Sequence, residues 1–216
     1  MNRNKKNKKT SIVTILFIGV FLNICLYIAQ KYNYSEFEDQ LIDFTQDEKA
    51  FMDALGHRES SDDYQKVSKF GYLGRYQFGE SALEELGYFK KTKRYWGPKN
   101  HWVGEWTGKH NIYSRDDFLR NHKIQDIAAK ELFLINWRYI KHKGLHDFVG
   151  KEVQGIKITK SGLIAGVHLL GVGGLYDFLV HNKKVRDGLG TEIKEYLELF
   201  NEYKLSLDQK PESTTS

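Results

Sequence analysis

The chain has a single cysteine, Cys25, among its 216 residues. One thiol cannot form an intramolecular disulfide or supply a zinc module that needs several cysteines, so both frameworks are excluded. The sequence has no internal repeat and no low-complexity bias. Its content of hydrophobic (40%) and aromatic (14%) residues argues against disorder throughout the chain. The length suits one domain with a substantial core, together with shorter appendages.

Acidic residues are absent from the first ten positions, which hold five basic ones: Arg3, Lys5, Lys6, Lys8 and Lys9. The rest of the chain balances 28 basic against 28 acidic residues, so the formal net charge of +5 comes from this tail. A domain that binds nucleic acid would normally concentrate positive charge on its folded part. We therefore expect no nucleic-acid partner.

The tail, residues 1–10, is followed by 19 residues without a charge, Ser11 to Ala29. A helix of that length spans about 28 Å, close to the hydrocarbon thickness of a bilayer. The basic cluster before it, with only Lys31 close behind, favours a cytoplasmic tail. The sequence thus predicts a single-pass anchor in the inner (cytoplasmic) membrane, with the remaining chain in the periplasm or otherwise outside the cytoplasm.

Other interpretations of residues 11–29 remain open. In a secretory signal peptide, cleavage after Ala29 would require a small residue at position 27, where this chain has Tyr27. Lipidation at Cys25 would follow Asn23 and Ile24, which are unsuitable residues before a lipidated cysteine. With an anchor or a cleaved signal, the exported part contains no cysteine and must be stable through packing alone.

Helical patterns dominate from Thr45 onward, after a linker at residues 30–44. Thr45 and Glu48 predict a capping box at the start of the first helix. Further helices are expected over Ser81–Leu86, from Asn121 to about His142, from Thr159 or Ser161 to Leu170, over Leu175–Val180 after a break at Gly171, Gly173 and Gly174, and after a cap at Thr191. Val67 to Phe78 suggests one small hairpin. These patterns predict a mainly α domain at residues 45–205, followed by a disordered tail at 206–216.

Glu59 follows Leu55, Met52 and Phe51 by four, seven and eight residues, which places it on the apolar face of the first helix. Burial and the negative end of the helix dipole both favour the protonated form of a carboxyl group at this position. Such a group can donate a proton near neutral pH, as glycosidic cleavage requires. Alternatively, Glu59 pairs with His57, Arg58 or a distant arginine and simply ends the helix.

Three ordered sequence blocks carry a family resemblance. Their sequences are Glu59-Ser60-Ser61, then Gly71-Tyr72-Leu73-Gly74-Arg75-Tyr76-Gln77-Phe78-Gly79, then Ala165-Gly166-Val167-His168-Leu169-Leu170-Gly171-Val172-Gly173-Gly174. With them, the chain resembles the lysozyme-like superfamily, and within it the lytic transglycosylases and goose-type lysozymes. It is closest to a phage- and secretion-associated branch of peptidoglycan hydrolases. The resemblance covers most of residues 45–205 and implies a lysozyme-like α+β domain with a small β-hairpin.

The resemblance also implies roles for residues in these blocks. Glu59 would be the catalytic acid and then the base, and Ser60 would line the same site. Gln77 would meet the N-acetyl groups of the glycan, while Tyr72 and Tyr76 would stack on sugars or pack the hairpin. His168 and Leu169 stand where many transglycosylases have Tyr and Asn. His168 would take over the polar contact of that Tyr, or would be a core histidine.

The implied reaction is cleavage of the β-1,4 bond between N-acetylmuramic acid (MurNAc) and N-acetylglucosamine (GlcNAc) in peptidoglycan. An inverting lysozyme needs a second carboxylate, for which Asp62 and Asp63 are the nearest candidates, although both suit a solvated turn. Lytic transglycosylases manage with one Glu and form 1,6-anhydro-MurNAc ends, and the absence of a convincing second acid favours that reaction. A hydrolase with the same substrate and a non-catalytic glycan-binding scaffold of an envelope machine are the alternatives. Chitin-type glycans share the N-acetylated β-1,4 linkage.

Other patterns are weaker. Trp96, Trp102 and Trp106 are the kind of rings that line a glycan groove or cover a core. His142 and His146 are four residues apart, but Gly144 between them and the lack of a carboxylate motif argue against zinc. We therefore expect no metal or other cofactor. The expected partners are peptidoglycan strands, the membrane through residues 11–29, and envelope or secretion machinery.

Overall fold

A computed structural model describes residues 44–97 and 99–207 of the chain, all within one compact unit. The basic tail, the segment at 11–29 and all but the last residue of the expected linker lie outside the described residues, as do residues 208–216. The predictions made for those parts therefore remain predictions. Leu205 and Leu207, at the end of the described residues, are both buried.

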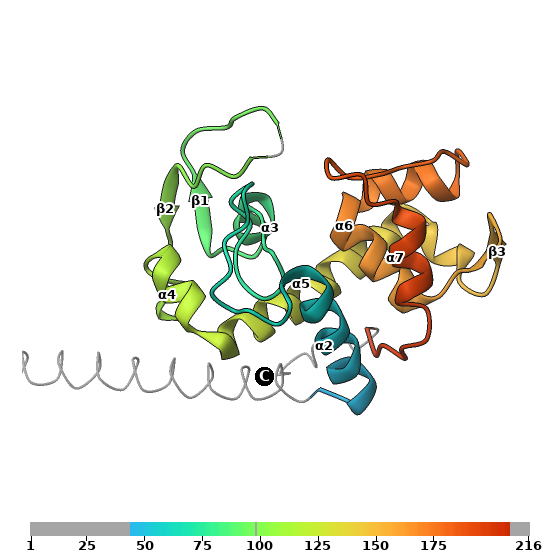
Figure 1. The fold of residues 1–216 in the computed structure, drawn as a ribbon, viewed down its shortest axis with the longest axis horizontal. Coiled ribbons are helices and arrows are strands. Elements are labelled where there is room, and N and C mark those ends of the chain that lie inside the picture. The colour runs from blue at the N-terminus through green and yellow to red at the C-terminus, as the bar shows by residue number, and fades with distance from the viewer. Residues whose placement is uncertain (1–43, 98, 208–216) are drawn as a thin grey trace, which may run out of the picture. The chain divides into compact units, whose positions relative to one another are not determined.

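The described domain is mainly α, as predicted, with two small antiparallel strand pairs (Figure 1). Its α-helices are α2 (Gln46–Ser60), α3 (Glu80–Glu85), α4 (Arg115–Arg120), α5 (His122–His142), α6 (Lys160–Leu179) and α7 (Ile193–Leu199). Short 3₁₀ helices are η1 (Lys109–Asn111) and η2 (Leu145–Phe148). The strands are β1 (Phe89–Lys91) with β2 (Gly104–Trp106), and β3 (Glu152–Val153) with β4 (Ile156–Lys157).

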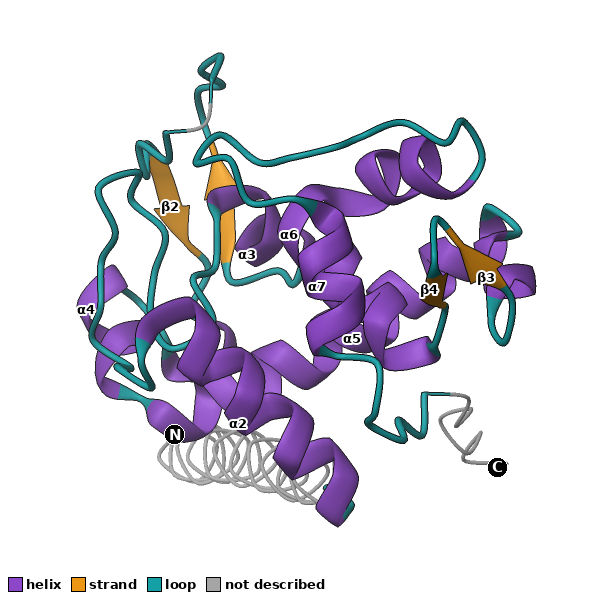
Figure 2. Ribbon diagram, turned by 45° about the vertical axis from the view of Figure 1, so that its right-hand side comes forward, coloured by secondary structure: helices purple, strands orange, loops and turns teal. Residues whose placement is uncertain are grey.

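The hairpin expected over Val67–Phe78 is present only as two isolated bridges, Val67 with Leu73 and Leu73 with Phe78. The regular pairs lie elsewhere, and β1 pairs with β2 in the register Phe89 to Trp106. A buried arginine and turn hydrogen bonds organise the Val67–Phe78 segment in place of a ladder, as described for the site below. Figure 2 shows β1 and β2 beside α3, far from β3 and β4.

Helix α2 carries the candidate acid and begins with the predicted capping box. The Glu48 amide donates to Thr45 Oγ1 (3.2 Å), and the Thr45 amide donates to Glu48 Oε2 (3.0 Å). Its apolar face is buried through Phe51, Met52 and Leu55. The helix ends where Ser61 adopts a left-handed conformation and its amide bonds back to the last turn. These local features set the register that positions Glu59 on the inner side of the last turn.

Helices α5 and α6 form the centre of the domain, with α7 packed against α6 (Figures 1 and 2). Helix α5 lies within the predicted range and has Asn121 as its N-cap, and it buries both apolar and polar side chains, including Gln125. Thr159 caps α6. Among residues 44–97 and 99–207, α6 is the one helix long and apolar enough to cross a membrane, but half of its apolar window is buried inside the domain.

The predicted break in helix α6 is present at Gly171 (φ 68°), where two helical segments meet at a kink, while Gly173 and Gly174 belong to the second segment. The predicted cap of the last helix is wrong. Thr191 does not cap α7. Its amide donates to Asp187 Oδ1 (2.8 Å) in the preceding turn, and Glu192 is the N-cap residue, in a capping box with Glu195.

His110 in η1 gives the domain a predicted sensitivity to acid. Its Nδ1 lies 2.7 Å from the Tyr88 hydroxyl, and burial lowers its pKa from 6.5 to about 4. Between these two pKa values the unfolded chain binds a proton on this histidine that the native state does not. The free energy of unfolding therefore falls as the pH falls from about 6.5 to 4. We expect His110→Gln, which keeps an acceptor for the Tyr88 hydroxyl, to make stability less dependent on pH. The difference in unfolding free energy between pH 7 and pH 4.5 should shrink by about 1–2 kcal/mol, a figure reduced from that of the full pKa shift because the ring is partly exposed. Urea unfolding at both pH values measures this difference, and an unchanged difference would contradict the assignment.

Candidate active site

Glu59 lies in the last turn of α2 with 16% of its side chain exposed, at the edge of the buried face. Its Oε1 accepts a hydrogen bond from the Tyr196 hydroxyl of α7 at 2.6 Å. The ring Nε2 of His168, from α6, lies 3.8 Å from the same oxygen. Three helices that are distant in sequence therefore bring a carboxyl group, a phenol and an imidazole together.

The two neighbours proposed as alternative partners of Glu59 are engaged elsewhere. His57 Nδ1 lies 3.2 Å from Asp62 Oδ2, and Arg58 Nη2 lies 3.9 Å from Glu195 Oε2. Neither side chain forms an ion pair with Glu59 in the described part of the chain. The interpretation of Glu59 as a helix-ending ion pair therefore loses its two local candidates.

Tyr196 was not predicted as a site residue, although the sequence placed it on the buried side of the last helix. It is 4% exposed. Burial, the charge of Glu59 and the hydrogen bond to Glu59 all raise the pKa of this phenol, so the hydroxyl stays protonated and acts as a donor. A buried tyrosine needs a partner for its hydroxyl, but sequence patterns cannot identify one that lies 137 residues away.

His168 lies against Glu59, as the resemblance implied, but Tyr196 makes the hydrogen bond. The His168 side chain is 8% exposed, and its Nδ1 is buried without a hydrogen-bond partner in the described residues. An orphaned N–H is costlier than an orphaned acceptor, so we assign a proton to Nε2 rather than to Nδ1. At 3.8 Å this N–H faces Glu59 Oε1 without bonding to it.

The structure corrects two of the predicted substrate contacts. Ser60 is buried, and its hydroxyl donates to the Gly56 carbonyl (3.1 Å), because the residue after Glu59 turns into the core rather than towards the site. Tyr76 is 0% exposed, and its hydroxyl donates to Asp126 Oδ1 (2.7 Å), so its ring cannot stack on a sugar. Burial and the charge of Asp126 raise the pKa of Tyr76.

Tyr72 and Gln77 are half-buried, and their contacts with substrate remain predictions. The Tyr72 ring lies against Gly79, where a Cβ atom would come within 3.0 Å of it. Gln77 has a left-handed backbone (φ 48°), and its side-chain amide donates to the Gly74 carbonyl (2.8 Å). The Gln77 amide thus supports its own turn.

Asp62 and Asp63, the candidates for a second carboxylate, serve the loop after α2. Partial burial opposes ionisation of Asp62, but hydrogen bonds and charge from Arg75 and from His57 outweigh it and lower its pKa. Arg75 Nη2 donates to Asp62 Oδ1 at 2.8 Å. Asp63 is exposed and accepts the amide of Gln65 (2.8 Å). Both carboxylates therefore have structural uses.

Arg75 occupies the centre of the Gly-Tyr-Leu-Gly-Arg-Tyr-Gln block and is 9% exposed. Its guanidinium donates to Asp53, Asp62, Tyr64 and Tyr76. The buried Gln125 fixes the backbone at Arg75, because its side-chain Oε1 accepts the Arg75 amide (2.9 Å). This block therefore holds the loop onto α2 and α5.

The three loop tryptophans separate into two groups. Trp102 and Trp106 stack on each other (centroids 5.7 Å apart) and pack edge-to-face against Phe89, so they cover the β1–β2 pair. Trp96 is fully exposed. Within the described ranges, no group of three or more His, Cys, Asp and Glu side chains is arranged to hold a metal ion.

The fold and the site define a mainly α domain with a partly buried glutamate at the meeting point of three helices. No family model, no curated protein and no solved structure matches the chain.

Proposed function

We propose that this chain is a lysozyme-like enzyme that cleaves the β-1,4 bond between MurNAc and GlcNAc in peptidoglycan. The proposal rests on Glu59, a partly buried carboxyl group with a phenol donor on one oxygen and an imidazole beside it. The resemblance of the three sequence blocks supports the same assignment. Membrane anchoring through residues 11–29 belongs to this proposal and would expose the domain to the cell wall.

The proposed reaction is intramolecular transfer. Glu59 gives its proton to the glycosidic oxygen as the C1–O bond breaks and the GlcNAc hydroxyl leaves. The carboxylate then takes the proton of the MurNAc 6-hydroxyl while O6 bonds to C1, which restores Glu59 and consumes no water. Because Oε1 accepts the Tyr196 hydroxyl, Oε2 is the oxygen that exchanges the proton. The engagement of Asp62 by Arg75 and His57 supports transfer over hydrolysis.

The test is to incubate the full chain in detergent with purified peptidoglycan in H₂¹⁸O and to analyse the products by mass spectrometry. Transfer gives 1,6-anhydro ends without ¹⁸O, whereas hydrolysis gives reducing ends that carry ¹⁸O. Reducing ends would replace the transferase with a lysozyme-type hydrolase. Binding without cleavage would leave the glycan-binding scaffold as the function and would refute the enzyme.

Tyr196→Phe should lower kcat about 10–100-fold with little change in KM, since it removes a hydrogen bond to a charged group worth about 1.5–3 kcal/mol. Without that donor, the negative charge that develops on Glu59 as it gives up its proton is less stabilised. Tyr139→Phe is the matched control, because the Tyr139 hydroxyl donates to Glu85 (2.6 Å) on the surface. An unchanged kcat in Tyr196→Phe would limit Tyr196 to packing.

A further inference from the structure

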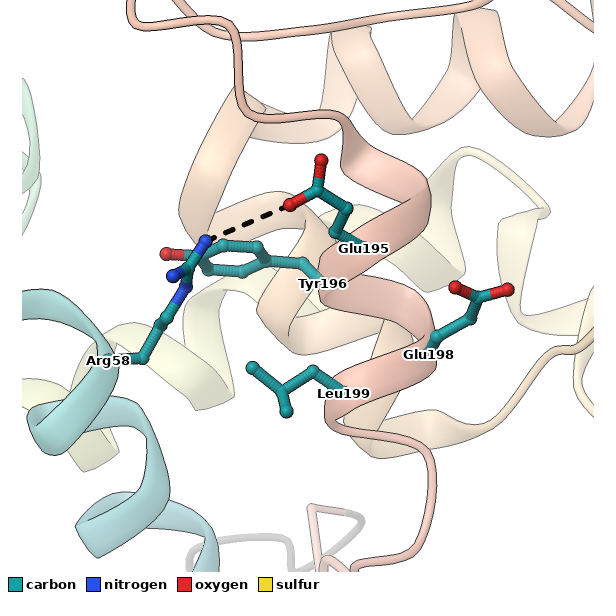
Figure 3. A pocket seen from close by; sticks show the side chains of 5 residues that line it. All are labelled: Arg58, Glu195, Tyr196, Glu198 and Leu199. Atoms are coloured by element: carbon teal, nitrogen blue, oxygen red, sulfur yellow. Dashed lines mark ion pairs between the residues drawn. The ribbon is translucent and has the colours of Figure 1, made fainter.

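A hollow of about 500 Å³ lies between the end of α2 and the outer side of α7 (Figure 3). It is lined by Arg58, Glu195, Tyr196, Glu198 and Leu199. Its volume falls in the range of pockets that hold small ligands. None of the predicted site residues lines it, so the sequence blocks that carry the resemblance do not account for it.

Tyr196 connects this pocket to the candidate acid. One end of the residue, its hydroxyl, donates to Glu59, while its ring forms a wall of the pocket under the Arg58 guanidinium (5.5 Å from the ring centroid). The pocket therefore begins one side chain away from the carboxyl group. A substituent on a sugar bound at Glu59 can extend into it.

The charges in the pocket are of both signs and are open to a ligand. Arg58 and Glu195 are 3.9 Å apart, with 43% and 57% of their side chains exposed. An exposed pair at this distance contributes little to stability, so a ligand can replace it at small cost. Glu198 is half-exposed, with Lys194 3.7 Å away on the same helix. Leu199 adds an exposed apolar wall.

We propose that this pocket binds the peptide attached to the lactyl group of muramic acid. This inference rests on the proposed function for its choice of substrate. Arg58 pairs with a peptide carboxylate through its planar guanidinium, Glu195 and Glu198 pair with the amino group of a diamino acid, and Leu199 contacts the alanine methyl group. The enzyme would then prefer glycan strands that carry peptides over denuded strands.

This ligand matches the pocket better than a bare sugar does. A strand without peptides presents hydroxyl and amide groups and one lactyl carboxylate per muramic acid but no cation, whereas the pocket presents one cation and two anions. A short peptide with a carboxylate and an amine has charges of both signs to complement them. Muramic acid is the glycan component that carries such a peptide next to the bond to be cut.

The experiment measures binding of two probes, muramyl tripeptide ending in a diamino acid and free MurNAc, to the full-length Glu59→Gln chain in detergent by calorimetry. We expect the tripeptide to bind about ten-fold more tightly than MurNAc. We expect Arg58→Gln, made in the same background, to remove that preference. Glu195→Gln should weaken it while keeping the capping box, because glutamine also serves at that position. Arg115→Gln on α4 is the matched control, with an exposed arginine paired to its neighbour Asp116.

Equal binding of the two probes would overturn the proposal, as would a preference that survives Arg58→Gln. Cleavage provides an independent check in the Glu59-containing enzyme. There the ratio of kcat/KM for peptide-bearing over amidase-denuded strands should fall about ten-fold in Arg58→Gln. A chain that binds the tripeptide with an Arg58-dependent preference but cuts neither kind of strand would refute the proposed function and leave the pocket assignment standing.

Discussion

Glu59→Gln should reduce cleavage of purified peptidoglycan by about 10³-fold or more, while the fold and glycan binding remain. The side-chain carbonyl of glutamine still accepts the Tyr196 hydroxyl, so the contact at 2.6 Å has a chemically equivalent acceptor. The amide cannot deliver a proton to the glycosidic oxygen or remove one from the 6-hydroxyl. General acid–base catalysis typically raises the rate of one proton-transfer step by about 10²–10⁴-fold, and here one group serves two such steps.

Glu85→Gln is the matched control for this variant. Glu85 also accepts a tyrosine hydroxyl, that of Tyr139 at 2.6 Å, but it lies on the surface of α3. Release of soluble muropeptides measures activity, co-sedimentation with peptidoglycan measures binding, and thermal unfolding measures the fold. A Glu59→Gln chain that retains a tenth of wild-type activity would exclude Glu59 as the proton donor.

Local sequence patterns predicted the position of Glu59 well. The Thr45–Glu48 capping box defines where α2 begins, and the spacing of Phe51, Met52 and Leu55 defines its buried side. Both signals act within two or three turns of one helix. The starts of α5 and α6 were predicted to within about two residues for the same reason. The mainly α class follows from the sum of such local signals.

Long-range partners could not be predicted in this way. The Tyr196 hydroxyl and Glu59 are 137 residues apart, and the Tyr76 hydroxyl and Asp126 are 50 apart. A sequence motif can identify a tyrosine as important, but it does not determine whether the side chain faces the core or the surface. That is why the motif left Tyr76 open between stacking on a sugar and packing the hairpin, whereas the structure places it in the core. Ser60 was misplaced for a related reason, since one residue of advance along a helix turns the side chain by about 100°.

Arg75→Leu should destabilise the domain by about 3 kcal/mol, since it removes a buried guanidinium together with the hydrogen bonds that it donates to two carboxylates and two tyrosines. The Arg75 guanidinium binds Asp53 (2.7 Å) and Asp62 (2.8 Å) and also donates to Tyr64 and Tyr76. For a domain of this size, the loss corresponds to a fall in Tm of roughly 6–12 °C. Tryptophan fluorescence during urea unfolding of the full chain in detergent measures this loss of stability, because all four tryptophans lie inside the domain, between residues 96 and 137.

The pH dependence of this effect distinguishes lost ion pairing from lost packing. In the native state Arg75 and His57 outweigh partial burial and lower the pKa of Asp62 below its ordinary value of 3.8. The stabilisation is therefore fully present above that value and is lost as the pH falls through the lower native pKa. The gap between wild type and Arg75→Leu should narrow as the pH falls below about 4, whereas a packing defect would leave it constant. Arg115→Leu, which removes an exposed arginine, should stay within about 0.5 kcal/mol of wild type throughout. An Arg75→Leu domain as stable as that control at pH 7 would mean that this arginine does not hold the loop onto α2.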